Sequence, residues 1–152
     1  MTEARSSGFT LVELMVVVVI LSIIVGIAYP SYRNYMTQTR RSDAQSILTQ
    51  VANNQEKFFS NCNRYTTTMD AGTIPGCDGL GYSNNLSPDG HYQVTVGTTT
   101  IAGAGTINTA FTATATPVAG GLQANNGALR IDSTGVKQWN KPGVGWSSWT
   151  KK

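Results

Sequence analysis

Residues Phe9–Tyr29 read FTLVELMVVVVILSIIVGIAY, and Glu13 is the one charged residue among them. At about 1.5 Å per residue, a helix of about 21 residues crosses a hydrocarbon layer of ~30 Å. A helix of a soluble domain needs only one apolar face. A cleaved secretory signal is the alternative, but such signals end in a small-residue cleavage site, whereas this run ends in Tyr29-Pro30-Ser31-Tyr32. We therefore expect the segment to be retained in the protein.

Besides this apolar segment, the length and composition of the chain fit a single domain. Its 152 residues are enough for a single core. Charged residues make up 12%, about half the usual share, and the net charge of +3 is too small to indicate nucleic acid by itself. Two cysteines and one histidine are fewer than the four ligands of a structural zinc site of Cys and His. We expect no metal and no cofactor.

Glu13 stands out because it lies early in an apolar helix. A carboxylate in the middle of a bilayer costs about 2.5–3.5 kcal/mol on insertion scales. Two interpretations remain open. The carboxylate lies at headgroup depth and is partly hydrated, or it pairs with a buried positive partner that offsets the cost of desolvation.

The sequence Gly8-Phe9-Thr10-Leu11-Val12-Glu13, preceded by a short polar leader and followed by an apolar helix, resembles the processing site of type IV prepilins. The resemblance implies that residues 1–8 are a cytoplasmic leader. A dedicated membrane peptidase would cut after Gly8 and N-methylate Phe9. It also implies that Glu13 serves assembly, that the precursor spans the bacterial inner membrane once with its head outside, and that the mature subunit enters an extracellular pilus.

Cleavage after Gly8 would create an α-amino group on Phe9, a cation at the end of an apolar helix. Glu13 of a neighbouring subunit could neutralise this amine, and the pair would fix the axial register of the two subunits. The partners that the resemblance implies are the prepilin peptidase, an assembly platform with its ATPase, and other pilin subunits.

A long helix is predicted from Phe9 to about Asn61. Gly26 and Pro30 mark the end of the apolar run, where proline predicts a kink or local melting; the alternative is that Pro30 ends the helix. Beyond it, apolar residues recur at helical spacing, which favours continuation. This stripe contains Ala44, Ile47, Leu48, Val51, Ala52, Gln55, Phe58 and Phe59, and the opposite, polar face contains Arg41, Gln45, Thr49, Asn53, Asn54 and Lys57.

The predicted helix has two halves. Residues 9–36 form the transmembrane and assembly half, and residues 37–61 form an amphipathic half that packs on a head of residues 62–152. In that head, Cys62 and Cys77 could close a disulfide loop, which would contribute about 3 kcal/mol. The export that the resemblance implies favours a disulfide, and the absence of CxxC spacing argues against a redox or metal role.

Apolar and polar residues alternate in three later segments, Tyr92–Val96, Thr109–Pro117 and Leu129–Ile131, and again after the turn signal at Ser133-Thr134-Gly135. We predict three or four antiparallel strands, hence an α+β fold. The tail from Trp139 to Lys152 is predicted to be irregular. Its three tryptophans either dock on the core or contact a partner.

The head also resembles PilE-like and competence-type minor pilins. The resemblance rests on Gln55-Glu56-Lys57-Phe58-Phe59, on Arg64-Tyr65-Thr66 and on the FTATATP segment. Many such subunits carry a cysteine pair near the C-terminus, whereas this chain has no cysteine after Cys77. We therefore do not carry over to this chain the shape of the C-terminal loop of those family members.

These observations leave several functions open. The first is a pilus subunit that assembles through its apolar helix and serves motility, adhesion or DNA uptake. The alternatives are a minor pilin whose head binds DNA and a pseudopilin of type II secretion. DNA could be bound by Arg130, Lys137 and Lys141, with Arg64, Lys151 and Lys152 completing a basic surface. An enzyme is not expected, because His91 is the one histidine and no GxSxG motif accompanies it.

Overall fold

A computed structural model describes residues 8–70, 72–100 and 108–149. Most of the predicted leader, residues 1–7, lies outside the described residues, as do Lys151 and Lys152 of the predicted basic surface. The chain divides into two compact units, Met1–Met36 and Thr37–Lys152.

The long helix α1 (Leu11–Cys62) confirms the prediction of a single N-terminal helix. It contains Pro30, so proline does not end it. The helix is the one described element that is long and apolar enough to cross a membrane. The predicted kink at Gly26 and Pro30 stays a prediction.

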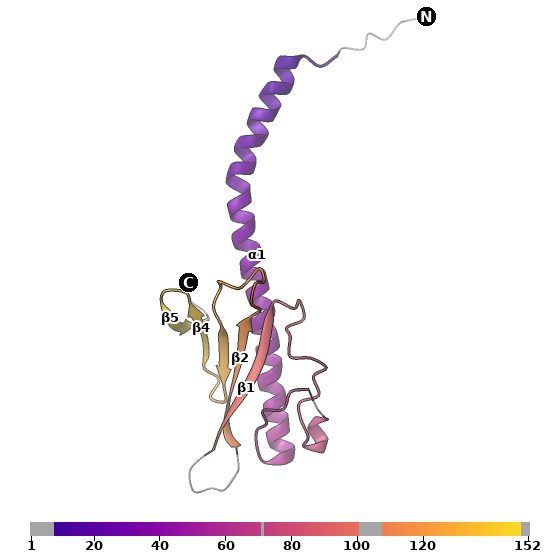
Figure 1. Cartoon of the computed structure of the whole chain (residues 1–152), viewed down its shortest axis with the longest axis vertical. Coiled ribbons are helices and arrows are strands. Elements are labelled where there is room, and N and C mark those ends of the chain that lie inside the picture. Colours follow the sequence, from indigo (N-terminus) through magenta and orange to yellow (C-terminus); the bar gives the residue numbers. More distant parts are fainter. Residues whose placement is uncertain (1–7, 71, 101–107, 150–152) are drawn as a thin grey trace, which may run out of the picture. The chain divides into compact units, whose positions relative to one another are not determined.

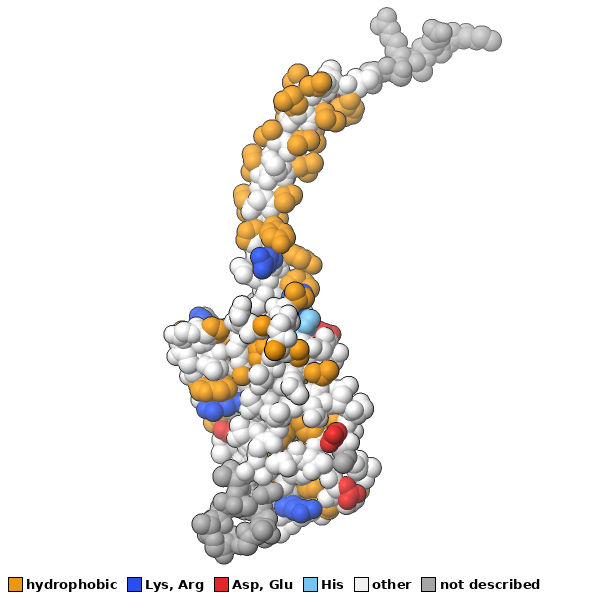
Figure 2. All heavy atoms as spheres, in the orientation of Figure 1, with side chains coloured by type: hydrophobic (Ala, Val, Ile, Leu, Met, Phe, Trp, Pro, Cys, Tyr) orange, Lys and Arg blue, Asp and Glu red, His pale blue; other side chains and the backbone are white. Residues whose placement is uncertain are grey.

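Within the described residues of the first unit, no other segment covers the apolar part of α1. Its large apolar side chains from Leu11 to Ile27 are between 47% and 74% exposed, and Phe9 just before the helix is 79% exposed. Figure 2 shows these side chains along this part of the helix. Because a soluble surface would not expose so much apolar area, this half requires lipid or other protein around it.

In the second unit, the amphipathic part of α1 packs on the sheet as predicted. Ala44, Ile47, Leu48, Val51 and Phe58 are buried, and Ala52 and Phe59 are partly buried against the same core. Gln55 is the polar member of the stripe. It is fully buried, and its side-chain amide donates to the carbonyl of Thr66 while its oxygen accepts from the Thr66 amide. Gln55 thus holds the chain that follows the helix.

The head contains a five-stranded antiparallel sheet in the order β1-β2-β3-β4-β5 (Figure 1). The strands are β1 (Tyr92–Thr100), β2 (Asn108–Pro117), β3 (Leu129–Asp132), β4 (Lys137–Lys141) and β5 (Gly145–Ser148). The α+β fold is confirmed, with one strand more than the three or four predicted.

The fifth strand corrects the prediction that the tail is irregular. β4 and β5 form a hairpin in which Asn140 pairs with Trp146 and Lys141 pairs with Gly145. The amide of Val144 donates to the carbonyl of Lys141 at 3.0 Å. Pro142 followed by Gly143 at a φ of 77° is the arrangement of a type II turn, which favours proline and then glycine. The Lys-Pro-Gly-Val sequence was the signal for this hairpin.

The strand register gives the sheet one apolar and one polar face. Tyr92, Val94, Phe111, Ala113 and Leu129 are buried on the face that contributes to the core with α1. Alternate residues point to the opposite, outer face. This outer face is rich in hydroxyl and amide side chains from neighbouring strands, among them Gln93, Thr95, Thr112, Thr114 and Thr116.

The segment between α1 and β1 is closed by a disulfide. Cys62 and Cys77 are bonded, as predicted. The segment includes the short 3-10 helix η1 (Ile74–Gly76) and buries Tyr65, Met69 and Leu80 in the core. The disulfide therefore links the end of α1 to a loop that contributes to the core.

Candidate functional site

Glu13 lies at the first turn of α1, where it takes part in a local capping arrangement. The amide of Glu13 donates to Thr10 Oγ1 at 3.2 Å, and Thr10 Oγ1 lies 3.4 Å from Glu13 Oε2. The backbone amide of Thr10 also donates to Glu13 Oε2, at 3.5 Å. This is a capping box, in which the cap residue and the residue three positions later satisfy each other's backbone amides.

The capping box is a role for Glu13 that was not predicted, although the Thr-x-x-Glu spacing is its sequence signal. Its two contacts to the carboxylate are long for hydrogen bonds, so they hold the carboxylate weakly. The Glu13 side chain is exposed. It therefore remains available to a positive group from another molecule.

The predicted DNA-binding residues do not share one face of the sheet. Arg130 pairs with Gln138 across β3 and β4, which places both on the outer face. The guanidinium carbon of Arg130 lies 4.0 Å from the ring centroid of Trp146, and its Nε donates to Gln138 Oε1 at 2.8 Å. Arg130 is therefore held flat over an aromatic ring, as in a cation–π contact.

Lys137 and Lys141 lie on the other face, because they alternate with Gln138 along β4. Lys137 Nζ lies 5.6 Å from the Trp149 ring centroid, and Lys141 Nζ lies 5.9 Å from that of Trp139. Arg64 is separate from all three and donates to the carbonyl of Cys77 at 3.2 Å. Each predicted cation of β3 and β4 thus has a tryptophan beside it.

Arg41, predicted to lie on the polar face of the helix, contacts the sheet. Its guanidinium carbon lies 3.6 Å from the Trp139 ring centroid, and Nη2 donates to Asn126 Oδ1 at 2.7 Å. Burial lowers the pKa of the Arg41 guanidinium. The indole of Trp139 in turn donates to the carbonyl of Asn126. Arg41 and Trp139 together fasten α1, β4 and the loop between β2 and β3.

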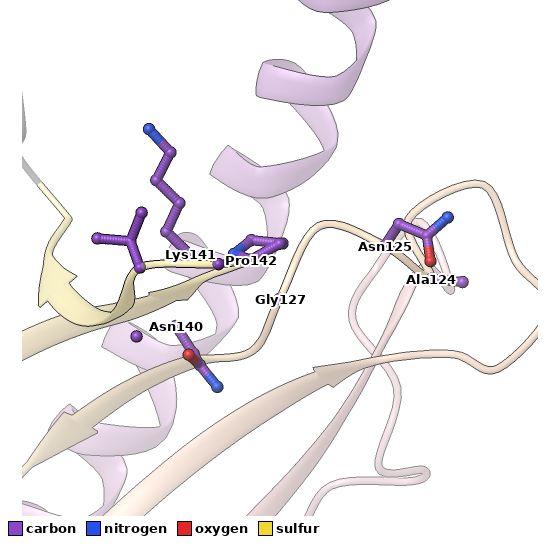
Figure 3. A pocket seen from close by; sticks show the side chains of 9 residues that line it. Ala124, Asn125, Gly127, Asn140, Lys141 and Pro142 are labelled. Atoms are coloured by element: carbon purple, nitrogen blue, oxygen red, sulfur yellow. The ribbon is translucent and has the colours of Figure 1, made fainter.

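An open groove of about 710 Å³ lies between that loop and the turn that joins β4 to β5 (Figure 3). Its lining includes Asn125, Gly127, Asn140 and Lys141. Gly127 has a φ of 78°, and a Cβ there would lie 1.8 Å from the carbonyl oxygen of Asn140. Glycine therefore permits the close approach of the loop to β4. The described residues include no cluster of three or more acidic, cysteine or histidine side chains that could hold a metal.

The exposed apolar helix, the carboxylate in its first turn and the disulfide-bearing antiparallel head together define the class of type IV pilins. A family model for the prokaryotic N-terminal methylation motif matches residues 4–29. The model described as type IV minor pilin ComP, DNA uptake sequence receptor, matches residues 30–129. The chain belongs to this family of type IV minor pilins.

Individual relatives agree with this assignment. Fimbrial protein EcpC of Eikenella corrodens is 30% identical over 132 residues, which cover 86% of this chain and 77% of that protein. Type IV major pilin protein PilA of Myxococcus xanthus is 39% identical over 62 residues, which cover 41% of this chain and 28% of the PilA chain. Type II secretion system core protein G of Aeromonas hydrophila is 35% identical over 68 residues, covering 45% and 48%. The predicted pilin family is confirmed.

Proposed function

We propose that the protein is a precursor in the bacterial inner membrane that is cut after Gly8, N-methylated on Phe9 and assembled into an extracellular type IV pilus. The observation that carries this proposal is the apolar part of α1, where the large apolar side chains from Leu11 to Ile27 are each at least 47% exposed. The match of residues 4–29 to the methylation motif supports the processing step. The cleavage would leave the apolar helix on the mature protein.

The apolar half of α1 can contact lipid before assembly and other subunits after it. Its apolar surface is compatible with a bilayer before assembly and with neighbouring helices after extraction. The Phe9 amine of one subunit would pair with Glu13 of another and set their axial register. A platform with its ATPase would drive the transfer. A repeated head-to-tail contact that does not close on itself builds a fibre.

The mass of the chain recovered from purified filaments tests this proposal. We expect a protein that begins at Phe9 and carries one additional methyl group on its amine. Gly8→Leu should leave the precursor uncut, because the peptidase would no longer find a residue without a side chain at the cleavage site. A filament subunit that begins at Met1 would contradict the proposal.

We propose further that the head binds DNA. The supporting observation is that the cations of β3 and β4 each lie beside a tryptophan, namely Trp139 of β4, Trp146 of β5 or Trp149 just after β5. They offer ammonium and guanidinium groups for phosphates and aromatic faces for bases. The family description as a DNA uptake sequence receptor favours the same function. Because Arg130 lies on the face opposite Lys137 and Lys141, we place the site at the β4–β5 edge of the sheet, which both faces border.

Changing both Lys137 and Lys141 to Gln should weaken DNA binding by full-length protein in detergent micelles. Each lost phosphate contact lowers the slope of log affinity against log salt by about 1, so we expect a slope smaller by about 2 and roughly ten-fold weaker binding at low salt. Arg64→Gln is the matched control, because its guanidinium is held at Cys77, and its affinity should stay close to that of the unchanged protein. Equal losses in both variants would contradict a site at this edge.

A further inference from the structure

One end of the second unit is tied to the beginning of the amphipathic half of α1. The side chain of Gln123, 1% exposed, donates from Nε2 to the carbonyl of Thr37 at 3.4 Å. Its oxygen accepts from the hydroxyl of Tyr92. Together with the bond from Arg41 to Asn126, these contacts fix the loop between β2 and β3 at the residues where the head begins.

This end of the head exposes apolar side chains that the core does not use. Leu122, beside the buried Gln123, is 72% exposed, and Val144, in the turn between β4 and β5, is 62% exposed. The loop and the turn border the groove of Figure 3, where the Lys141 side chain extends away from β4. We call Leu122, Val144 and Lys141 the rim.

The covalent chain limits how far the rim can lie from the bilayer that holds the precursor. Tyr29, Tyr32 and Tyr35 follow the apolar run and are 59%, 62% and 67% exposed. Tyrosines at such spacing suit the headgroup layer, where aromatic residues are enriched. Thr37 comes two residues after Tyr35, about 3 Å along a helix. The covalent chain therefore keeps Thr37 within a few residues of the headgroups, and Gln123 joins the head to Thr37.

We propose that the rim docks on the phospholipid surface while the subunit is anchored in the membrane. Leu122 and Val144 enter the headgroup layer, and the Lys141 ammonium binds lipid phosphate. The proposal rests on the membrane-anchored precursor described above.

The other charges at this end do not favour a strongly anionic surface. Asp43 accepts from the amide of Asp89 at 3.3 Å near the start of β1, so two carboxylates lie at the same end as Lys141. The Arg41 guanidinium already stacks on the Trp139 ring and donates a hydrogen bond to Asn126. The rim itself offers two apolar side chains and one ammonium, a combination that suits zwitterionic phospholipid. Docking would orient the head before assembly, and extraction of the helix would release it.

Photo-crosslinking of the full chain in phosphatidylcholine vesicles tests the proposal. Benzoylphenylalanine is placed at one position at a time: Leu122, Val144, Val136 or Val18. Val136 is the matched control, because it is 47% exposed but lies at the opposite end of β4 from Val144. Val18, in the middle of the apolar run, reports insertion of the helix. Adducts are identified by mass spectrometry.

We expect lipid adducts at Val18, Leu122 and Val144, with at least a five-fold lower yield at Val136. Lipid adducts at Val18 but none at the rim would overturn docking and leave membrane anchoring intact. Protein adducts at the rim would assign it to a second copy of the chain instead. Equal lipid yields at Val136 and Val144 would show a freely tumbling head, and no adduct at Val18 would refute the anchoring on which the proposal rests.

Discussion

A Glu13→Gln variant is expected to enter the membrane and lose its leader normally, yet to be absent from filaments. Glutamine keeps the size of the side chain and can still serve the capping box with Thr10, so the start of α1 should be preserved. It removes only the negative charge. A buried amine left without its partner costs about 3–5 kcal/mol. At each subunit contact this corresponds to a loss of affinity of roughly 150-fold to 4,000-fold.

The measurement is the ratio of variant to unchanged subunit in sheared filaments from cells that express both in equal amounts. Thr10→Val is the matched control, because it removes the capping hydroxyl and keeps the carboxylate; we expect it to be incorporated at close to the normal level. If Glu13→Gln enters filaments as well as the unchanged chain while Thr10→Val does not, helix capping rather than charge pairing is the role of Glu13.

The parts of this protein that sequence predicts well are those whose signal is local. The apolar run and the stripe from Ala44 to Phe59 each repeat at helical spacing, and both lie in α1. The alternation around Val94 and Ala113 is equally local, and both residues are buried in paired strands. In each case the periodicity of a short segment decides its structure.

The parts that sequence missed depend on which segments meet. Arg41 reads as a residue of the polar helix face, and only its contact with Trp139 of β4 shows that it joins helix to sheet. The separation of Arg130 from Lys137 follows from strand register, which a list of basic residues does not contain. The β4–β5 hairpin is different, since Pro142-Gly143 is a local turn signal that could have predicted it.

Replacing Phe58 with Ala should produce the largest loss of stability in the head. Phe58 is fully buried in the core between α1 and the sheet. Truncation of a buried phenylalanine removes its apolar contacts and leaves a cavity, which costs about 3–5 kcal/mol. Alanine is the best helix former, so α1 itself should not be weakened. We expect the urea midpoint of full-length protein in detergent, followed by tryptophan fluorescence, to fall by roughly 2 M at ordinary m values.

Two neighbours on the same helix serve as controls. Lys57 is exposed, so Lys57→Ala should leave the midpoint almost unchanged. Phe59 is only partly buried, and its ring centroid lies 4.7 Å from that of Tyr65. The loss of urea midpoint in Phe59→Ala should therefore lie between the losses in Lys57→Ala and Phe58→Ala. This order reflects the orientation of the stripe, because Phe58 points into the core and Phe59 lies at its border. A larger loss for Phe59→Ala than for Phe58→Ala would mean that α1 is rotated relative to the sheet.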